Sequence, residues 1–331
     1  MATNEPTTLP ERPAWELPHP LRRNQLIGAI TKFLAGSEAL RIGMRELLER
    51  EVDQAGDDAV ERLGQHLAVA GSDWDYYAAD PLARRIHHAV AERVLQPASA
   101  LLGREHLPAV AGRPVIVFAN HLSYSDANLL EVLLFRDEDG GRAMSDRLTT
   151  VAGPKVYSSL QRRFSSLCFG TIKTPQSTAL SSEDAVMNPR QVARAARRSI
   201  EVAHERLGQG DALLVFAEGT RSRTAGVQQL LTAVARYLDC PGVSVLPVGI
   251  VGTDQLFPIG EPGLNPVTAI ARLGRPFTAA ALQARAGGDR RLMMDAVGIA
   301  IADVLPPAQH GVYGPGWPDL DEARRILRDL T

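Results

Sequence analysis

Residues 115–126 read VIVFANHLSYSD, an apolar run followed by a polar segment that holds a histidine and an aspartate. The unbroken apolarity of Val115–Ala119 is typical of a strand buried on both faces. The apolar segment from Ala127 to Phe135 predicts a helix directly after it. This order favours an α/β domain, in which polar groups at the carboxyl ends of strands commonly form the site.

Short apolar runs and helical patterns continue to alternate along the chain. The expected strands are residues 148–152, 212–216, 244–251 and 267–273, and the expected helices are residues 191–207, 228–238 and 292–304. We therefore predict an α/β domain over residues 101–331, with a mixed, largely parallel central sheet flanked by helices. Helical spacing over residues 21–100 predicts a helical N-terminal region, and residues 1–20 are expected to be a loose leader.

Composition narrows the class of protein. The 331 residues, 45% of them hydrophobic, can bury a large core. A net charge of −2, without a basic run interleaved with aromatics, argues against nucleic-acid binding. Cys168 and Cys240 lack metal or redox spacing, which favours a reducing compartment. Because neither a signal peptide nor an apolar run of ~20 residues is visible, we expect a cytoplasmic protein, soluble or peripheral at the inner face of the membrane.

The histidine and the aspartate of the opening stretch allow two interpretations. His121 could be an ordinary loop histidine, and Asp126 could be only the N-cap of the following helix. A tight turn can also bring the two side chains together, and the two roles of the aspartate are compatible, because one carboxylate oxygen can cap while the other accepts from an imidazole. The aspartate then fixes the tautomer of the imidazole and stabilises the cation formed when the far nitrogen takes a proton.

A second polar stretch follows another apolar run, where residues 213–223 read LLVFAEGTRSR. Arg221 and Arg223 offer planar guanidinium groups, which suit phosphate recognition. Glu218 could shape a pocket, but we favour a structural salt bridge that orients the arginines. Gly219 is expected to allow a close backbone approach or a positive φ.

Four blocks, in this order, resemble the motif blocks of the glycerolipid acyltransferases. The blocks are the HX4D stretch at 120–126, GPK at 153–155, FAEGTRSR at 216–223 and VLPVGI at 245–250. This family includes lysophosphatidate acyltransferases and the soluble plastid-type glycerol-3-phosphate acyltransferases. The resemblance covers about residues 100–306, including the turn LGRP at 273–276.

The resemblance implies transfer of an acyl group from acyl-CoA or acyl-carrier protein to a glycerol hydroxyl. It makes His121 the general base and Asp126 its orienting carboxylate. Arg221 is then expected to bind the phosphate of the acceptor, while Glu218, Gly219 and Thr220 shape the pocket.

The second block departs most from the family pattern. Lys155 follows Gly-Pro, and Lys173 stands where the lysophosphatidate branch often has an arginine. Each lysine is either a phosphate contact or a solvated surface charge. The stretch from Thr174 to Arg190 is longer than usual and could form a lid or a wall of the acyl channel.

The chemistry requires neither a metal nor a cofactor. A thioester already has a good leaving group, so a positioned imidazole suffices to activate the hydroxyl. Acylation of Ser123 or Ser125 is a minor alternative. His87 and His88 are neighbours on a helix and point ~100° apart, so we expect surface histidines rather than a shared metal site.

We therefore expect an O-acyltransferase of phospholipid synthesis, with 1-acylglycerol-3-phosphate as the first choice of acceptor. Glycerol 3-phosphate or another lipid acceptor is the alternative, and a thioester or phosphoester hydrolase or a non-catalytic lipid-binding module remains open. The partners are acyl-CoA or acyl-carrier protein and a glycerophosphate or lysophospholipid. The apolar stripe from Leu26 to Leu34 could contact a membrane, although packing within the protein is favoured.

Overall fold

The fold is built on a nine-stranded β-sheet. The computed structural model describes residues 23–33, 38–175, 187–257 and 264–330. The strands are β1 (Tyr76–Tyr77), β2 (Ala100–Leu102), β3 (Val115–Ala119), β4 (Leu148–Ala152), β5 (Gly170–Lys173), β6 (Ala212–Val215), β7 (Ser244–Val251), β8 (Ile270–Leu273) and β9 (Phe277–Thr278). Their order across the sheet is β1-β5-β4-β6-β3-β7-β8-β2, and β9 pairs with β7. The site-bearing strands β3 and β6 therefore lie side by side at the centre.

The centre of the sheet is parallel and its borders are mixed. Strand β3 pairs in parallel with both β6 and β7, and β4 pairs in parallel with β5 and β6. Strands β1, β8 and β9 run antiparallel to their partners β5 and β7, whereas β2 is parallel to β8. The prediction of a mixed, largely parallel sheet flanked by helices is confirmed.

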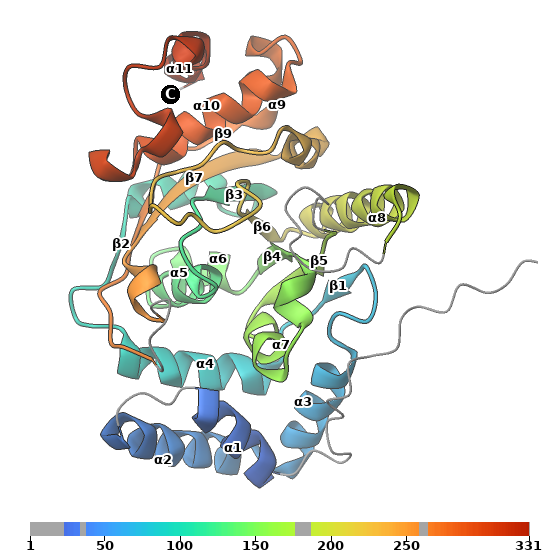
Figure 1. Cartoon of the computed structure of the whole chain (residues 1–331), viewed down its shortest axis with the longest axis vertical. Coiled ribbons are helices and arrows are strands. Elements are labelled where there is room, and N and C mark those ends of the chain that lie inside the picture. The colour runs from blue at the N-terminus through green and yellow to red at the C-terminus, as the bar shows by residue number, and fades with distance from the viewer. Residues whose placement is uncertain (1–22, 34–37, 176–186, 258–263, 331) are drawn as a thin grey trace, which may run out of the picture.

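Eleven α-helices are found among the described residues. They are α1 (Arg23–Phe33), α2 (Glu38–Ala55), α3 (Asp57–Val69), α4 (Pro81–Val94), α5 (Asp126–Phe135), α6 (Gly141–Ser145), α7 (Leu160–Ser166), α8 (Pro189–Gly208), α9 (Ala279–Arg285), α10 (Arg290–Ala302) and α11 (Asp321–Leu330). Short 3-10 helices are η1 (Arg104–Val110), η2 (Pro154–Tyr157), η3 (Thr232–Asp239), η4 (Thr253–Gln255), η5 (Pro307–Gln309), η6 (Gly311–Tyr313) and η7 (Pro318–Leu320). Figure 1 shows α1 to α4 at one end of the molecule and α9 to α11 at the other.

Two apolar cores cover the two faces of the sheet, and β3 contributes side chains to both of them. Val115 and Val117 belong to the core shared with α1 to α5, whereas Ile116 and Phe118 belong to the core shared with α8, α10 and α11. Successive side chains of a strand point to opposite faces, so a strand between two cores must be apolar throughout. This burial fixes the position at which β3 ends and its polar continuation begins.

The N-terminal helices share the first of these cores. Leu26 and Ile27 of α1 are buried in it, which favours packing over membrane contact for this stripe. Helix α4 begins after Asp80, whose carboxylate accepts hydrogen bonds from the backbone of Leu82 and Ala83. The same region also contains β1, between α3 and α4, and leads into β2, so it is not helical throughout.

Some sequence-based boundaries differ from the structure. Residues 228–238 were expected to form a helix, but only a 3-10 helix forms, over Thr232–Asp239. The strand expected over residues 267–273 begins at Ile270. Residues 1–20 and most of the stretch from Thr174 to Arg190 lie outside the described residues. Within the described part of the chain, no helix combines the length and apolarity that a bilayer crossing requires.

Candidate active site

The end of β3 is fastened to its neighbour by a side chain. Asn120 is buried and its amide nitrogen donates to the carbonyl of Ile250, while its amide oxygen accepts from the backbone N–H of the same residue. This pair continues the ladder between β3 and β7 by one position. These two hydrogen bonds fix the backbone at Asn120 and so help to position the next residue, His121.

The structure brings His121 and Asp126 together. The imidazole Nδ1 lies 2.7 Å from Oδ2 of Asp126, at hydrogen-bond distance. An ionised carboxylate can only accept, so Nδ1 carries the proton and Nε2 is left as the basic nitrogen. The five-residue spacing thus produces the arrangement expected of a general base and its orienting group.

Asp126 is fully buried and accepts from four other donors. These donors are the backbone N–H groups of Leu122 and Ser123, the hydroxyl of Ser123, and the hydroxyl of Thr253 at 2.5 Å. All the backbone donors precede the helix, so the alternative in which Asp126 caps α5 is wrong. The carboxylate instead organises the loop that carries His121, which makes the orientation of the imidazole a property of the turn itself.

The backbone and ring of His121 are also fixed. Its backbone N–H donates to Glu218 at 2.7 Å, and its carbonyl accepts from the N–H of Ser222 at 2.7 Å. The imidazole stacks on Phe216, with ring centroids 4.3 Å apart and an angle of 22° between the planes. Through these contacts with His121, the loop after β6 fixes the position of the loop after β3.

Glu218 has a different partner from the one expected. We favoured a salt bridge to Arg221 and Arg223, but within the described residues its carboxylate pairs with neither. It accepts instead from the backbone N–H groups of His121 and Gln228, at 2.7 and 2.8 Å. Burial raises the pKa of Glu218 to about 7, although both backbone hydrogen bonds and the nearby imidazole lower it. Gly219 has a φ of 72°, in agreement with the expected positive φ.

The raised pKa of Glu218 predicts a dependence of stability on pH. Between its usual pKa of 4.5 and about 7, the folded protein binds more protons here than the unfolded chain does. The stabilising contribution of Glu218 is therefore present below the unfolded pKa and is lost as pH rises through the folded one.

We expect the free energy of unfolding of wild type to fall, relative to that of Glu218→Gln, as the pH rises from about 5 to about 8. Urea denaturation of both proteins across this range measures it. Glu138→Gln, at an exposed position, serves as the control. Parallel pH profiles for wild type and Glu218→Gln would contradict the assigned pKa.

One cavity of about 1030 Å³ gathers most of the predicted site residues. Those that line it are His121, Lys155, Gly219, Thr220, Arg221 and Arg223. The imidazole and the guanidinium groups, about a hundred positions apart in sequence, therefore face the same space. Asp126 and Glu218 do not line the cavity, but both accept hydrogen bonds from His121 and so fix its position there.

The rest of the cavity wall is largely apolar. Its aliphatic and aromatic lining includes Val151, Ala152, Phe169, Val192, Ala196, Ile200, Leu231, Val234 and Tyr237. Val192, Ala196 and Ile200 repeat every fourth residue of α8 and so form one stripe along that helix. Thr150 also lines the cavity, and its buried hydroxyl has no hydrogen-bond partner among the described residues. The lining thus combines cationic side chains, among them also Arg236, with a larger set of apolar ones.

Lys173 does not join the other predicted site residues. Its Nζ donates to the carbonyl of Gly71 at 2.6 Å and lies 4.4 Å from the ring centroid of Trp74. Burial lowers its pKa. The lysine therefore links β5 to the N-terminal region. Because it does not line the cavity and is partly buried, it is neither of the two things expected, a phosphate contact or a solvated surface charge.

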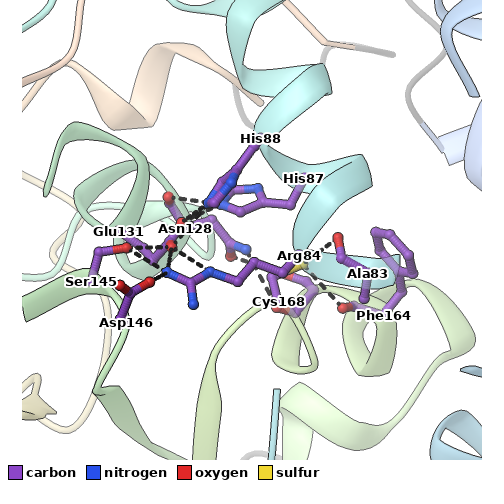
Figure 2. Close-up of polar contacts among 11 residues, drawn as sticks. Ala83, Arg84, His87, His88, Asn128, Glu131, Ser145, Asp146, Phe164 and Cys168 are labelled. Carbon is purple, nitrogen blue, oxygen red and sulfur yellow. Dashed lines mark hydrogen bonds and ion pairs between the residues drawn. The ribbon is translucent and has the colours of Figure 1, made fainter. Parts of the chain in front are cut away.

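His87 and His88 are not the surface residues that we expected. Both Nε2 atoms lie 3.0–3.1 Å from the carboxylate of Glu131, which is fully buried on α5 (Figure 2). Two adjacent side chains of α4 can both contact Glu131 because this residue, on the neighbouring helix α5, lies between them. Arg84 and Ser145 donate to the same carboxylate, at 3.2 and 2.7 Å.

The cluster around Glu131 has two possible uses. The two imidazoles and the carboxylate lie close enough together to hold a metal ion. However, the guanidinium of Arg84 already neutralises Glu131, and burial, which alone would raise its pKa, is outweighed by hydrogen bonds from His87 and His88 that hold the pKa below its usual range. The cluster is best described as a buried polar link between α4 and α5, the helix that begins with Asp126.

Comparison with known protein families gives a match over the part of the chain that holds these residues. Residues 100–251 match the family model described as Acyltransferase. This part of the chain is therefore similar to an acyltransferase domain. The match agrees with the resemblance to the glycerolipid acyltransferases, because it spans both motif-bearing strands and all the predicted site residues.

A solved structure also resembles the chain. It is the 1-acyl-sn-glycerophosphate (LPA) acyltransferase PlsC from Thermotoga maritima, with 19% sequence identity and a TM-score of 0.42. The likeness covers 85% of this chain and 95% of that one. No curated protein sequence matches the chain. The assignment of the acyltransferase domain rests on the family match and the motif residues, since the superposition is loose.

Sequence reasoning missed three residues in or next to the candidate site. Tyr124 lies within the first motif and lines the cavity. Arg162 of α7 contacts the ring of Tyr124, and Thr253 donates to Asp126. Tyr124 could have been found from its place between the histidine and the aspartate. Arg162 and Thr253 carry no local signal, because only the folded chain brings them to the first motif.

Proposed function

We propose that this protein is an O-acyltransferase that moves a fatty acyl group from a thioester to a hydroxyl of a glycerophosphate acceptor. The observation that carries the proposal is the shared cavity, in which His121, held by Asp126, faces the same space as Arg221 and Arg223. Neither group alone is specific, since loop histidines and surface arginines are common. A base and a cationic cluster in one cavity fit a phosphate-bearing nucleophile.

The reaction follows from the basic Nε2 of His121. It takes the proton of the acceptor hydroxyl while that oxygen attacks the thioester carbonyl. The tetrahedral intermediate then expels the thiolate, which takes a proton from the imidazolium. Asp126 stabilises the imidazolium between these two steps. No metal or cofactor is required in this scheme, because the thiolate is already a good leaving group.

The two parts of the cavity suit the two substrates. The cationic side holds the phosphate of the acceptor, since guanidinium groups bind phosphate oxygens in a planar, bidentate manner. The hydrophobic side, bounded by α8, suits the fatty acyl chain of acyl-CoA or acyl-carrier protein. The thioester carbonyl then lies where the two sides meet, next to His121.

We propose 1-acylglycerol-3-phosphate as the acceptor, with glycerol 3-phosphate as the alternative. The sequence of the four motif blocks supports both. We also propose a cytoplasmic location, with the lipid acceptor reached at the inner face of the membrane and with peripheral contact there. Acyl-CoA or acyl-carrier protein would then be drawn from the cytoplasm.

A thiol-release assay with an acceptor panel tests the function. The purified protein is given an acyl-CoA or an acyl-carrier-protein thioester with 1-acylglycerol-3-phosphate, glycerol 3-phosphate, glycerol or no acceptor. We expect thiol release that depends on a phosphorylated acceptor, and a matching acylated product by mass spectrometry. Equal release without acceptor would replace the proposal by a hydrolase, and no release with any pair would remove it.

Arg221→Ala is expected to weaken acceptor binding. Loss of a charge-assisted hydrogen bond should raise the KM for the phosphorylated acceptor about 10- to 100-fold, with a smaller change in kcat. Steady-state kinetics with varied acceptor measures this. Arg197→Ala, at an 83% exposed side chain on α8, is the matched control and should leave KM unchanged. An unaltered acceptor KM in Arg221→Ala would remove this residue from the phosphate site.

A further inference from the structure

Thr253 reaches the pair of His121 and Asp126 from a distant part of the chain. It stands two residues after the end of β7, at the start of η4, and is 1% exposed. Its hydroxyl donates to Oδ1 of Asp126 at 2.5 Å. Thr253 does not line the cavity, so it does not touch a substrate bound there. Any contribution that it makes to the reaction therefore passes through Asp126.

The two carboxylate oxygens of Asp126 have different partners. Oδ2 accepts from Nδ1 of His121 at 2.7 Å and from the backbone N–H of Leu122 at 2.6 Å, whereas Oδ1 accepts from the hydroxyls of Ser123 and Thr253. The backbone N–H of Ser123 lies within hydrogen-bond distance of both oxygens. In the described part of the chain, Thr253 is thus the one donor to this carboxylate that lies outside the turn before α5. The other donors move with the turn and cannot fix it from outside.

The backbone after β7 places Thr253 next to this turn. Gly252 has a φ of 86°, in the left-handed region that favours glycine, and a Cβ at this position would collide with the carbonyl of Thr268. One turn of the argument earlier in the strand, Ile250 is held to Asn120 by two hydrogen bonds. Strand β7 and its extension therefore hold the turn that carries the imidazole at both of its ends, through Asn120 and through the carboxylate.

We propose that Thr253 is a positioning residue, which holds the carboxylate of Asp126 where it keeps the imidazole of His121 in place at the cavity. This inference rests on the proposed function. Without the hydroxyl of Thr253, Oδ1 keeps only the donors of Ser123, and the carboxylate can turn towards them. Oδ2 then shifts relative to Nδ1, and the imidazole follows it. A displacement of about 1 Å in a catalytic group costs on the order of 10²-fold in rate.

The decisive variant is Thr253→Val, which replaces the hydroxyl by a methyl group of similar size. We expect kcat to fall about 10- to 100-fold, while the KM values of acceptor and thioester donor change by less than about twofold, because Thr253 touches neither substrate. Thr253→Ser keeps the hydroxyl and should retain kcat within about threefold. A loss carried by KM, or a Thr253→Ser variant as slow as Thr253→Val, would overturn the inference. If Thr253→Val fails to fold, as judged by circular dichroism, Thr253→Ala replaces it.

Thr149→Val is the matched control. Thr149 is also 1% exposed, and its hydroxyl donates to a buried carboxylate, Oδ2 of Asp211, at 2.6 Å, but it does not line the cavity. Its replacement removes the same kind of hydrogen bond, so stability in urea should fall about as much as in Thr253→Val, whereas kcat should stay within about twofold of wild type. An equal fall of kcat in both variants would show a general loosening of the fold and overturn the inference.

Proton NMR of His121 separates this inference from the proposed function. The hydrogen-bonded proton on Nδ1 gives a low-field signal, assigned by its loss in His121→Ala, which Thr253→Val should shift or broaden and Thr149→Val should not. If wild type transfers acyl groups and Thr253→Val keeps its kcat within about threefold, the inference is overturned and the function stands. If wild type transfers nothing but Thr253→Val alone alters the signal, the control of His121 by Thr253 stands and the function falls. An unaltered or absent signal in a protein without transfer overturns both.

Discussion

Replacing His121 with alanine is expected to lower kcat by at least about 10²- to 10⁴-fold, the usual contribution of a positioned general base. Without the imidazole, the acceptor hydroxyl must attack while it still holds its proton. The fold should persist, because the backbone hydrogen bonds of this residue to Glu218 and from Ser222 do not use the side chain. Steady-state acyl transfer with saturating acceptor measures the loss, and circular dichroism checks the fold.

His106→Ala is the control for this change. His106 lies on η1 and does not line the cavity, so its removal should leave kcat within a factor of about two. Binding of glycerol 3-phosphate to His121→Ala should also stay close to wild type, since the arginines remain. Turnover near the wild-type rate in His121→Ala would show that the base lies elsewhere.

Glu131→Ala is expected to lower the free energy of unfolding by about 3–5 kcal/mol. Removing one partner of a buried ion pair leaves the other charge uncompensated, which costs far more than the pair itself contributes. Here Arg84 loses its buried partner and keeps Asp146, a half-exposed one, at 2.9 Å. His88 and Ser145 also lose the acceptor of their hydrogen bonds, whereas His87 keeps the carbonyl of Asn128. Urea denaturation followed by circular dichroism measures the effect.

Glu138→Ala provides the comparison for Glu131→Ala. Glu138 is 81% exposed and lies 3.7 Å from Arg142, so its loss should change stability by no more than about 0.5 kcal/mol. Glu131→Gln should fall between the two, because the amide can accept some of the same hydrogen bonds without the charge. Equal stability of Glu131→Ala and Glu138→Ala would mean that the cluster is not a structural link.

The parts of the fold that could be read from sequence are those with a strong local pattern. The bounds of β3, β4 and β7 agree with the expected ranges, because β3 and β7 are largely apolar runs and β4 is rich in the β-branched residues Thr and Val. Strand β1 spans only Tyr76–Tyr77, too short for any periodic pattern. Residues 228–238 have helical spacing, yet tertiary packing leaves them only a 3-10 helix.

The same contrast holds for the site. The pairing of His121 with Asp126 could be predicted because both lie on one tight turn. The partners of Glu218 could not be, since a nearby arginine is the obvious ion-pair partner and a backbone N–H from another loop leaves no trace in the sequence. Arg162 of α7 contacts the ring of Tyr124, and Lys173 contacts the carbonyl of Gly71 instead of the cavity; both outcomes depend on how distant segments pack.

The outer strands of the sheet have a consequence for how the protein is made. Ala100 of β2 pairs with Ile270, so this early strand must wait for a partner that is translated about 170 residues later. Closing such long loops is slow. A nascent chain that has not yet passed residue 270 carries an unpaired β2, and its backbone groups are open to other chains. Ribosome pausing between residues 102 and 270 would therefore leave β2 open to pairing with other chains.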